Sequence, residues 1–193
     1  MRDADVRASV LKMLADQHAG DRATRIVEEM GVWSGYARID VAVINGELTG
    51  YEIKSDRDTL GRLPSQATLY GRVFDRVVLV VGKKHVQAAK KVVPRWWGIT
   101  VAKLGPGGVG LTPQRTPKTN PSIDSYLLAK LLWRQEAIEA LAAKNLAAGW
   151  RSKSVDDLHQ RLASELPVSE LASIVRSALK ERSAWLGKPI CNQ

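Results

Sequence analysis

Residues 38–54, which read RIDVAVINGELTGYEIK, constrain the fold of this chain more than any other segment. β-Branched and other apolar residues dominate both halves, and the Asn-Gly pair between them is the strongest short-range signal for a hairpin. The segment therefore predicts two antiparallel strands. Asp40, Glu52 and Lys54 lie within these strands, where charged side chains are costly unless they are paired or bind a metal ion.

The length of the hairpin loop decides which of these charges meet. Side chains alternate across a strand, so Glu52 and Lys54 share one face of the hairpin. A two-residue turn would place Asp40 opposite Tyr51, on the other face. A three-residue loop over residues 45–47 places Asp40 opposite Glu52 instead. We predict the three-residue loop, which crowds the three charged side chains together.

Two neighbouring carboxylates need a cation. In a poorly solvated site they repel by on the order of several kcal/mol, so one would stay protonated unless a cation lay between them. Mg²⁺ (or Mn²⁺) resolves this conflict, because such an ion binds one or two carboxylates together with waters and phosphate oxygens. The ion would activate a water as nucleophile, and Lys54 would orient or deprotonate that water or stabilise the pentavalent phosphate. The alternative is a plain salt bridge between Glu52 and Lys54 on a solvent-facing sheet.

The spacing of these residues resembles a nuclease motif. An aspartate followed twelve residues later by Glu-Ile-Lys, ending at Lys54, is similar to the PD-(D/E)XK superfamily of restriction-endonuclease-like and RecB-like nucleases. Ile39 stands in place of the proline of the motif. The resemblance implies an α/β fold with an α-β-β-β-α-β core and a mixed sheet. It also implies a metal site formed by Asp40, Glu52 and the backbone carbonyl of Ile53.

Two further parts of the chain fit the same resemblance. The superfamily often has an upstream acid on a helix, and we predict a short helix over residues 22–30 that carries Glu28 and Glu29, of which we favour Glu29. In SQATLY, Gln66 and Tyr70 are four residues apart and share one helical face. This pair resembles the Q-x-x-x-Y motif of RecB-like and phage exonuclease members, where it lies beside the metals and helps to hold DNA.

The remaining sequence predicts alternating strands and helices followed by a helical extension. Apolar periodicity predicts, in order, helix 3–18, strands 38–44 and 48–55, a helix opened by Pro64, strand 75–82, helix 83–93 and strand 97–104. Three prolines within residues 112–121 predict a linker, so we expect a nuclease-like domain over 1–115 and a C-terminal helical domain over 122–193. Predicted helices in that domain cover 125–143, 154–166 and 168–186, with Ser154 and Ser169 as N-cap candidates.

The resemblance extends over nearly the whole chain. DADVRASVL, ARIDVAVINGELTGYEIKSDRDTLGRLPSQ, VFDRVVLVVG, VPRWWGI and LLWRQEAIEAL together resemble a family of small bacterial and phage proteins within this superfamily. The resemblance to this family does not indicate which substrate the expected nuclease acts on. The substrate class therefore has to come from charge and from the site itself.

The charge of the chain favours a polyanionic partner. Lys and Arg number 29 against 20 Asp and Glu, which gives a net charge of +9 and a pI near 9.8 and points to DNA. Residues 136–166 resemble the helix-extension-helix pattern of small DNA-binding modules such as SAP domains, although a helical cap against the sheet is the alternative. Two groups of basic residues are candidates for phosphate contacts, or else belong to the solvated surface. The first is Lys83, Lys84, Lys90 and Lys91, and the second is Arg151 and Lys153.

Composition also excludes several classes of protein. The chain has no apolar run of membrane-spanning length and starts without the apolar core of a signal peptide, so we expect a cytoplasmic protein with no membrane partner. Cys191 is the sole cysteine, which excludes an internal disulfide and a cysteine-based zinc site. We predict a Mg²⁺-dependent deoxyribonuclease. The alternative is a catalytically silent DNA-binding or regulatory module that keeps the nuclease fold.

Overall fold

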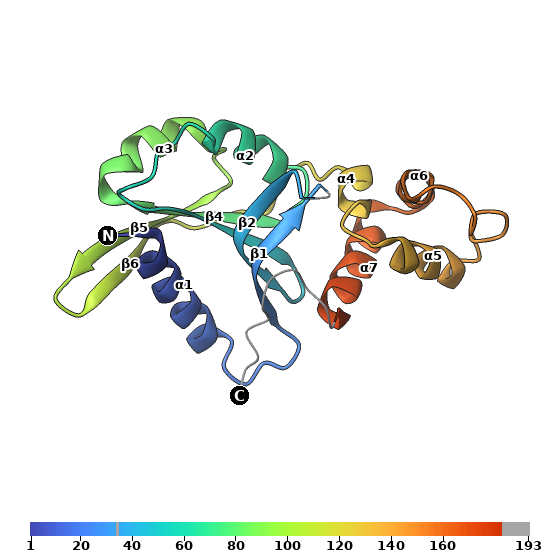
Figure 1. Cartoon of the computed structure of the whole chain (residues 1–193), viewed down its shortest axis with the longest axis horizontal. Coiled ribbons are helices and arrows are strands. Elements are labelled where there is room, and N and C mark those ends of the chain that lie inside the picture. Colours follow the sequence, from blue (N-terminus) through green and yellow to red (C-terminus); the bar gives the residue numbers. More distant parts are fainter. Residues whose placement is uncertain (34, 183–193) are drawn as a thin grey trace.

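A six-stranded mixed sheet forms the centre of the computed structural model, which describes residues 1–33 and 35–182 (Figure 1). Neighbouring strands follow the chain order β1-β2-β3-β4-β5-β6. The pairs β3–β4 and β4–β5 are parallel, and the other pairs are antiparallel. The strands are β1 (Arg25–Val32), β2 (Ala37–Ile44), β3 (Leu48–Lys54), β4 (Arg76–Gly82), β5 (Gly98–Gly105) and β6 (Gly108–Arg115).

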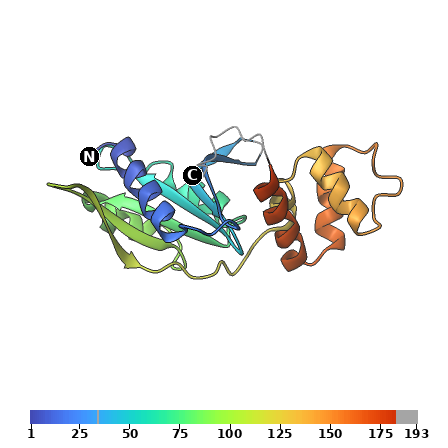
Figure 2. The ribbon, with the colours of Figure 1, turned by 90° about the horizontal axis from the view of Figure 1, so that it is seen from below.

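Helices cover both faces of the sheet. Helix α1 lies on one face and α2 and α3 lie on the other, while α4 to α7 gather at one end of the molecule (Figures 1 and 2). The order α1-β1-β2-β3-α2-β4 confirms the predicted α/β class with an α-β-β-β-α-β core and a helical extension. The helices are α1 (Asp3–Gln17), α2 (Leu63–Tyr70), the 3-10 helix η1 (Lys83–His85), α3 (Val86–Val92), α4 (Ser125–Ala129), α5 (Arg134–Ala143), α6 (Val155–Glu165) and α7 (Val168–Glu181).

Strand β4 shows why the sheet lies between two layers. Val78 and Val80 pack in one apolar cluster with the buried residues of α1, and Val77, Leu79 and Val81 pack in the other cluster. A continuous apolar run of this kind is typical of a parallel strand that is buried on both faces. None of the described helices combines the length and the apolar character that crossing a bilayer requires.

The predicted loop between β2 and β3 is confirmed. Ile44 pairs with Leu48, and Val41 pairs with Tyr51, which leaves three residues in the loop. Asn45 closes the loop, because its backbone N–H donates to the carbonyl of Glu47 at 3.0 Å and its side-chain oxygen accepts from the N–H of Glu47 at 3.0 Å. Glu52 therefore occupies the register position opposite Asp40.

The predicted helix over residues 22–30 is wrong, because this segment forms strand β1. Ile26 packs in the cluster beneath α1, whereas Val27 packs in the cluster on the other face, as successive side chains of a strand do. Val27 pairs with Ala42 and Met30 pairs with Ile39. Hydrogen bonds to β2 therefore outweighed an apolar spacing that also suits a helix.

The proline-rich segment and the C-terminal helices depart from prediction in detail. Strand β6 extends through residues 112–115, so the irregular connection is shorter than residues 112–121 suggested. The predicted helix over 125–143 is divided into α4 and α5. Ser154 accepts a hydrogen bond from the N–H of Asp157 and caps α6 as expected, whereas α7 starts after Pro167 and leaves Ser169 inside the helix. Cys191 and the end of the helix predicted over 168–186 lie outside the described residues.

The helical region shares its core with the sheet. Leu171 and Val175 of α7 belong to the same apolar cluster as Ile44 of β2. The guanidinium of Arg176 contacts a carboxylate oxygen of Asp75 at 3.2 Å, next to the start of β4. The helices are therefore packed against the α/β part by apolar contacts and by an ion pair.

Candidate active site

Asp40 lies where strands β2 and β3 separate. The last residue pair between the strands before this point is Val41 with Tyr51. Beyond it, the backbone N–H of Ile53 donates to Asp40 Oδ2 at 2.7 Å instead of to a backbone carbonyl. The carboxylate therefore lies in the gap between the strands, and does not project from the face of the hairpin as the sequence suggested.

Arg7 of α1 binds Asp40 from the other side. Its Nη2 lies 2.8 Å from Asp40 Oδ1, and its Nη1 donates to the Asp40 carbonyl at 3.0 Å and lies 2.8 Å from Glu29 Oε1. Sequence reasoning missed Arg7. The available signal was its position beside Val6 and Val10, which face the sheet from α1, so that a cation there reaches the sheet as well.

Glu52 and Lys54 form a buried pair on the face covered by α2. Glu52 is 1% exposed and Lys54 is 6% exposed. Glu52 Oε1 accepts hydrogen bonds from Lys54 Nζ and, at 2.6 Å, from Gln66 Nε2. The salt bridge between Glu52 and Lys54 that the alternative predicted is present, but its expected place on a solvent-facing sheet is wrong, because the pair is covered by protein.

Two buried oxygen atoms at this pair have no donor. Among the described residues, Glu52 Oε2 and Gln66 Oε1 are buried and have no hydrogen-bond partner. Both side chains line the cavity that also contains Asp40, Ile53 and Lys54. A buried oxygen without a partner costs free energy, so the cavity wall offers two acceptor atoms that a cation or a donor would satisfy.

Burial governs the protonation of both acids. It raises the pKa of Glu52 to about 7, with a further increase from the charge of Asp40, whereas Lys54 acts in the opposite direction. Burial likewise raises the pKa of Asp40, although the hydrogen bond from Ile53 and the charge of Arg7 oppose the increase. Two acids that hold their protons more strongly than usual would each be stabilised by a nearby divalent cation.

Tyr70 does not reach the cavity, which corrects its expected role beside DNA. The side chain is fully buried and its ring contacts Phe74 and Trp97, with ring centroids 5.8 and 6.3 Å apart. Its hydroxyl donates to the backbone carbonyl of Arg38 at 2.7 Å, and Gln66 Nε2 lies 3.3 Å from the same hydroxyl. Tyr70 therefore positions Gln66 and β2 from behind.

Of the two upstream acids, Glu29 reaches the cavity. Glu29 lines it, whereas Glu28 is not among the lining residues. The backbone of Glu29 has a positive φ of 53°, and its carboxylate contacts Arg7 at 2.8 Å and Arg38 at 2.5 Å. Its position on β1 corrects the expectation of a helical acid. Both carboxylate oxygens already face a guanidinium.

The cavity has a volume of about 540 Å³ and opens between the β1–β2 turn, the end of β3 and the start of α2. No group of three or more His, Cys, Asp or Glu side chains within residues 1–33 and 35–182 is arranged to hold a metal ion. A cation here would depend on Asp40, Glu52 and the Ile53 carbonyl. The residues that line the cavity are Asp3, Glu29, Gly35, Tyr36, Ala37, Arg38, Asp40, Glu52, Ile53, Lys54, Asp58, Arg62, Ser65, Gln66 and Leu69.

The candidate phosphate-binding residues lie in two separate places. Lys83, Lys84, Lys90 and Lys91 are exposed on η1 and α3, and α3 contacts α2, which forms one wall of the cavity. The loop between α5 and α6 lies at the far end of the helical region (Figures 1 and 2). That loop carries the exposed residues Arg151 and Lys153.

The loop between α5 and α6 is ordered by a third basic residue. Arg134 donates to the backbone carbonyls of Arg151 and Lys153 at 2.8 and 2.6 Å. These bonds leave the side chains of both loop residues at the surface. The lysines of η1 and α3 therefore belong to a segment that packs against α2 without lining the cavity, and Arg151 and Lys153 belong to the separate α5–α6 loop.

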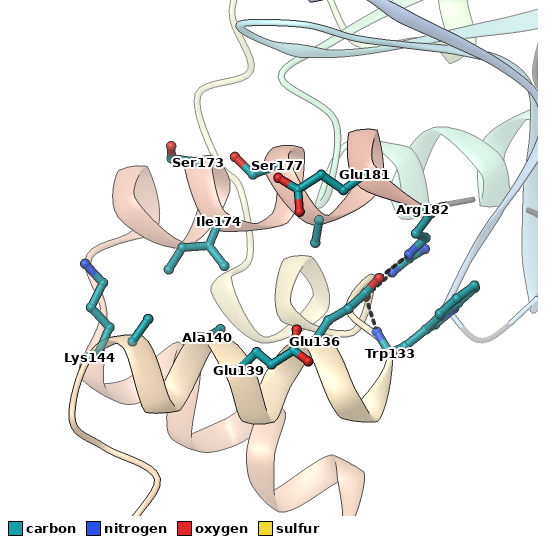
Figure 3. A pocket seen from close by; sticks show the side chains of 12 residues that line it. Trp133, Glu136, Glu139, Ala140, Lys144, Ser173, Ile174, Ser177, Glu181 and Arg182 are labelled. Atoms are coloured by element: carbon teal, nitrogen blue, oxygen red, sulfur yellow. Dashed lines mark hydrogen bonds and ion pairs between the residues drawn. The ribbon is translucent and has the colours of Figure 1, made fainter. Parts of the chain in front are cut away.

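A second cavity, of about 610 Å³, lies between α5 and α7 (Figure 3). Glu136 is its most buried acid, and both of its oxygens are bonded, to Arg182 and to the N–H of Trp133. This network caps α5 and joins it to the end of α7. Unlike Glu52, Glu136 has no free buried oxygen, so its arrangement is structural.

Comparison with known proteins identifies relatives from phage. A family model described as "Bacteriophage P4 protein cII" matches residues 1–186. Protein cII of Enterobacteria phage P4 is 24% identical over 182 residues, which cover 94% of this chain and 68% of that protein.

Two solved structures are more distant neighbours. A protein of unknown function from Silicibacter pomeroyi has a TM-score of 0.46 at 18% identity, and the match covers 80% of this chain and 96% of the other. Pyrococcus furiosus SfsA in complex with Ca²⁺ has a TM-score of 0.35 at 13% identity, with 60% and 64% covered.

Proposed function

This chain belongs to the bacteriophage P4 protein cII family, and we propose that it hydrolyses DNA phosphodiester bonds with the help of a divalent cation, as a nuclease of the PD-(D/E)XK type. The observation that carries the proposal is the buried Glu52 carboxylate. Its Oε1 is held by Lys54 and Gln66, while its Oε2 lies without a partner in the wall of the cavity that also contains Asp40.

The donor set suits Mg²⁺ or Mn²⁺. Asp40 and Glu52 supply carboxylate oxygens and Ile53 supplies a backbone carbonyl, which are the ligand types that these hard cations prefer. Glu52 Oε2 is free to accept a cation, and burial, the main cause of the raised pKa of both acids, favours a site where a cation would stabilise the ionised carboxylates. When bound, the cation would neutralise charge on the phosphodiester and lower the pKa of a water.

Lys54 and Gln66 would organise the reaction. The ammonium of Lys54 lies beside Glu52 on the cavity wall and would place a positive charge against the phosphate in the transition state. Gln66 fixes the orientation of Glu52 through its 2.6 Å hydrogen bond. Tyr70, through its bond to the Arg38 carbonyl, would hold β2 and keep Asp40 at the correct distance.

DNA is the partner that the charge supports best. The chain has a net charge of +9, and the exposed lysines of η1 and α3 lie on the helix next to the cavity wall. These lysines would neutralise phosphates along a strand whose scissile bond lies in the cavity. Arg151 and Lys153 would contact DNA further away, from the α5–α6 loop.

A silent DNA-binding or regulatory module with the same fold is the second candidate. The observation that favours it is Arg7, which binds Asp40 and Glu29 and so supplies much of the positive charge that a cation would bring. The described residues also contain no group of three acids suited to a metal. Under this hypothesis Arg7 replaces the metal, and DNA is bound without being cut.

A cleavage assay separates the two candidates. We would incubate the full chain with linear, circular, single-stranded and branched DNA in Mg²⁺, in Mn²⁺ and in EDTA, beside the Lys54→Ala variant. Hydrolysis that requires the cation and is abolished in Lys54→Ala, with an unchanged circular dichroism spectrum, supports the nuclease. Salt-sensitive DNA binding without hydrolysis of any substrate supports the silent module.

A further inference from the structure

The turn between β1 and β2 places an aromatic ring in the wall of the cavity. Tyr36 lines the same cavity as Glu52 and is 83% exposed, more than any other large apolar side chain of the described residues. Its ring meets that of Trp33 edge-on, with centroids 6.2 Å apart and an angle of 60° between the planes. A contact of this kind covers at most one face of the tyrosine ring, so a highly exposed Tyr36 offers its other face to a flat partner.

The backbone of Tyr36 is hydrogen-bonded to Trp33. Trp33 and Gly35 have positive φ angles of 57° and 86°, and the N–H of Tyr36 donates to the carbonyl of Trp33 at 3.0 Å. Trp33 itself packs against the main apolar cluster. The backbone of Tyr36 is thus hydrogen-bonded to a residue that packs on the core, and its ring lies in the wall of the cavity.

Arginines lie around the same cavity. Arg38, which is two residues from Tyr36, pairs with Glu29 at 2.5 Å, and the exposed Arg62 lines the cavity at the start of α2. An aromatic face, guanidinium groups and carboxylates in one cavity match the parts of a nucleotide, namely a base, a phosphate and the cation that accompanies it.

We propose that Tyr36 stacks on an unpaired base, so that the cavity takes single-stranded DNA or the unpaired end of a duplex. This inference rests on the proposed function. A base in a duplex has both faces covered by its neighbours, and an aromatic side chain can stack on it only after the base is unstacked. The cavity, of about 540 Å³, has the size of a site for one small ligand, which suits one nucleotide unit of a strand.

Fluorescence anisotropy of the full chain with labelled oligonucleotides in Ca²⁺ tests the inference independently of cleavage in Mg²⁺. Tyr36→Ala should weaken binding of a single strand by about tenfold, because the stacking of one base on the ring is lost. Binding of a blunt duplex should not change. Tyr36→Phe, which keeps the ring, should restore single-strand affinity. Leu104→Ala is the matched control, because Leu104 is 59% exposed and does not line the cavity.

The outcomes separate this inference from the proposed function. Equal weakening for single strand and duplex, no weakening for either, or a Tyr36→Phe variant as weak as Tyr36→Ala would overturn the stacking site. A selective effect of Tyr36 on single-strand binding would support the site even if wild-type protein cuts no DNA in Mg²⁺, in which case the nuclease proposal alone fails. If the wild-type protein cuts DNA but Tyr36→Ala has no selective effect on single-strand binding, the nuclease proposal stands and the stacking site alone fails.

Discussion

Arg7 Nη2 lies 2.8 Å from Asp40 Oδ1, although the two residues are 33 positions apart and belong to α1 and β2. The other oxygen of Asp40 accepts the N–H of Ile53 at 2.7 Å. A helix is thus connected directly to the point where β2 and β3 separate. Because Arg7 stands beside the carboxylates that would hold a cation, its charge should oppose cation binding while it stabilises the fold.

Replacing Arg7 should therefore separate stability from cation affinity. Arg7→Gln removes ion pairs with Asp40 and Glu29, and we expect a decrease of about 1–3 kcal/mol in the free energy of unfolding, measured by urea denaturation. At pH 8 the variant should bind Mn²⁺ more tightly, as isothermal titration calorimetry would show. Lys12→Gln, an exposed change on the same helix, should alter neither quantity. Weaker Mn²⁺ binding by Arg7→Gln would contradict the assigned role.

Cation binding should depend on pH through Glu52. Because burial raises the folded-state pKa of Glu52 to about 7, the protonated acid competes with the cation below that pH. The dissociation constant for Mn²⁺ should rise by up to about tenfold per pH unit as the pH falls below 7, and should level off above it. Calorimetry across this range measures the effect. An affinity that stays constant down to pH 5 would show that Glu52 is ionised throughout.

Tyr70 should matter for stability and not for contact with DNA. Tyr70→Phe removes the donor from a part-buried hydrogen bond to the Arg38 carbonyl, so we expect a decrease of about 1–2 kcal/mol in the free energy of unfolding. The affinity for DNA, measured by anisotropy, should stay the same because the side chain is fully buried. Tyr36→Phe provides the control for stability, since its side chain lies at the surface. A large change in DNA affinity for Tyr70→Phe would contradict this prediction and would indicate that Tyr70 contacts DNA.

The lysines of α3 should contribute through phosphate neutralisation. Lys90→Ala combined with Lys91→Ala should reduce the slope of log affinity against log salt by about 0.7–0.9 for each phosphate that is no longer neutralised, without a change in sequence preference. The same measurement on an Arg151→Ala, Lys153→Ala variant tests the α5–α6 loop separately. Lys12→Ala lies on the opposite face of the sheet and should leave the slope unchanged. If the α3 variant and the α5–α6 loop variant both keep the salt slope of the wild type, neither group of residues neutralises phosphates, and DNA binds at another surface.

Sequence predicted those parts of the site that are local. The three-residue loop over residues 45–47 and the alternating strands around it set the register that puts Asp40 opposite Glu52, because a hairpin brings together residues that are close in sequence. The four-residue spacing of Gln66 and Tyr70 correctly placed both on one helix. These features depend on backbone geometry within one or two elements.

Contacts between distant elements could not be predicted in this way. The apolar spacing of residues 22–30 predicts a helix. The segment is a strand because pairing with β2, and not its own propensity, decides its conformation. Tyr70 is buried because Trp97 packs against it, and nothing near Tyr70 in the sequence indicates that contact. Arg7 was missed for the same reason.

Titration of the metal-free protein with Mn²⁺, followed by electron paramagnetic resonance of the free ion, tests the central claim most directly. Wild type should remove Mn²⁺ from solution with saturation, whereas Asp40→Asn and Glu52→Gln, with circular dichroism spectra like that of wild type, should abolish nearly all of this binding. Saturable binding that depends on both carboxylates is the predicted result. Absence of binding by wild type, or undiminished binding by the two variants, would contradict the account.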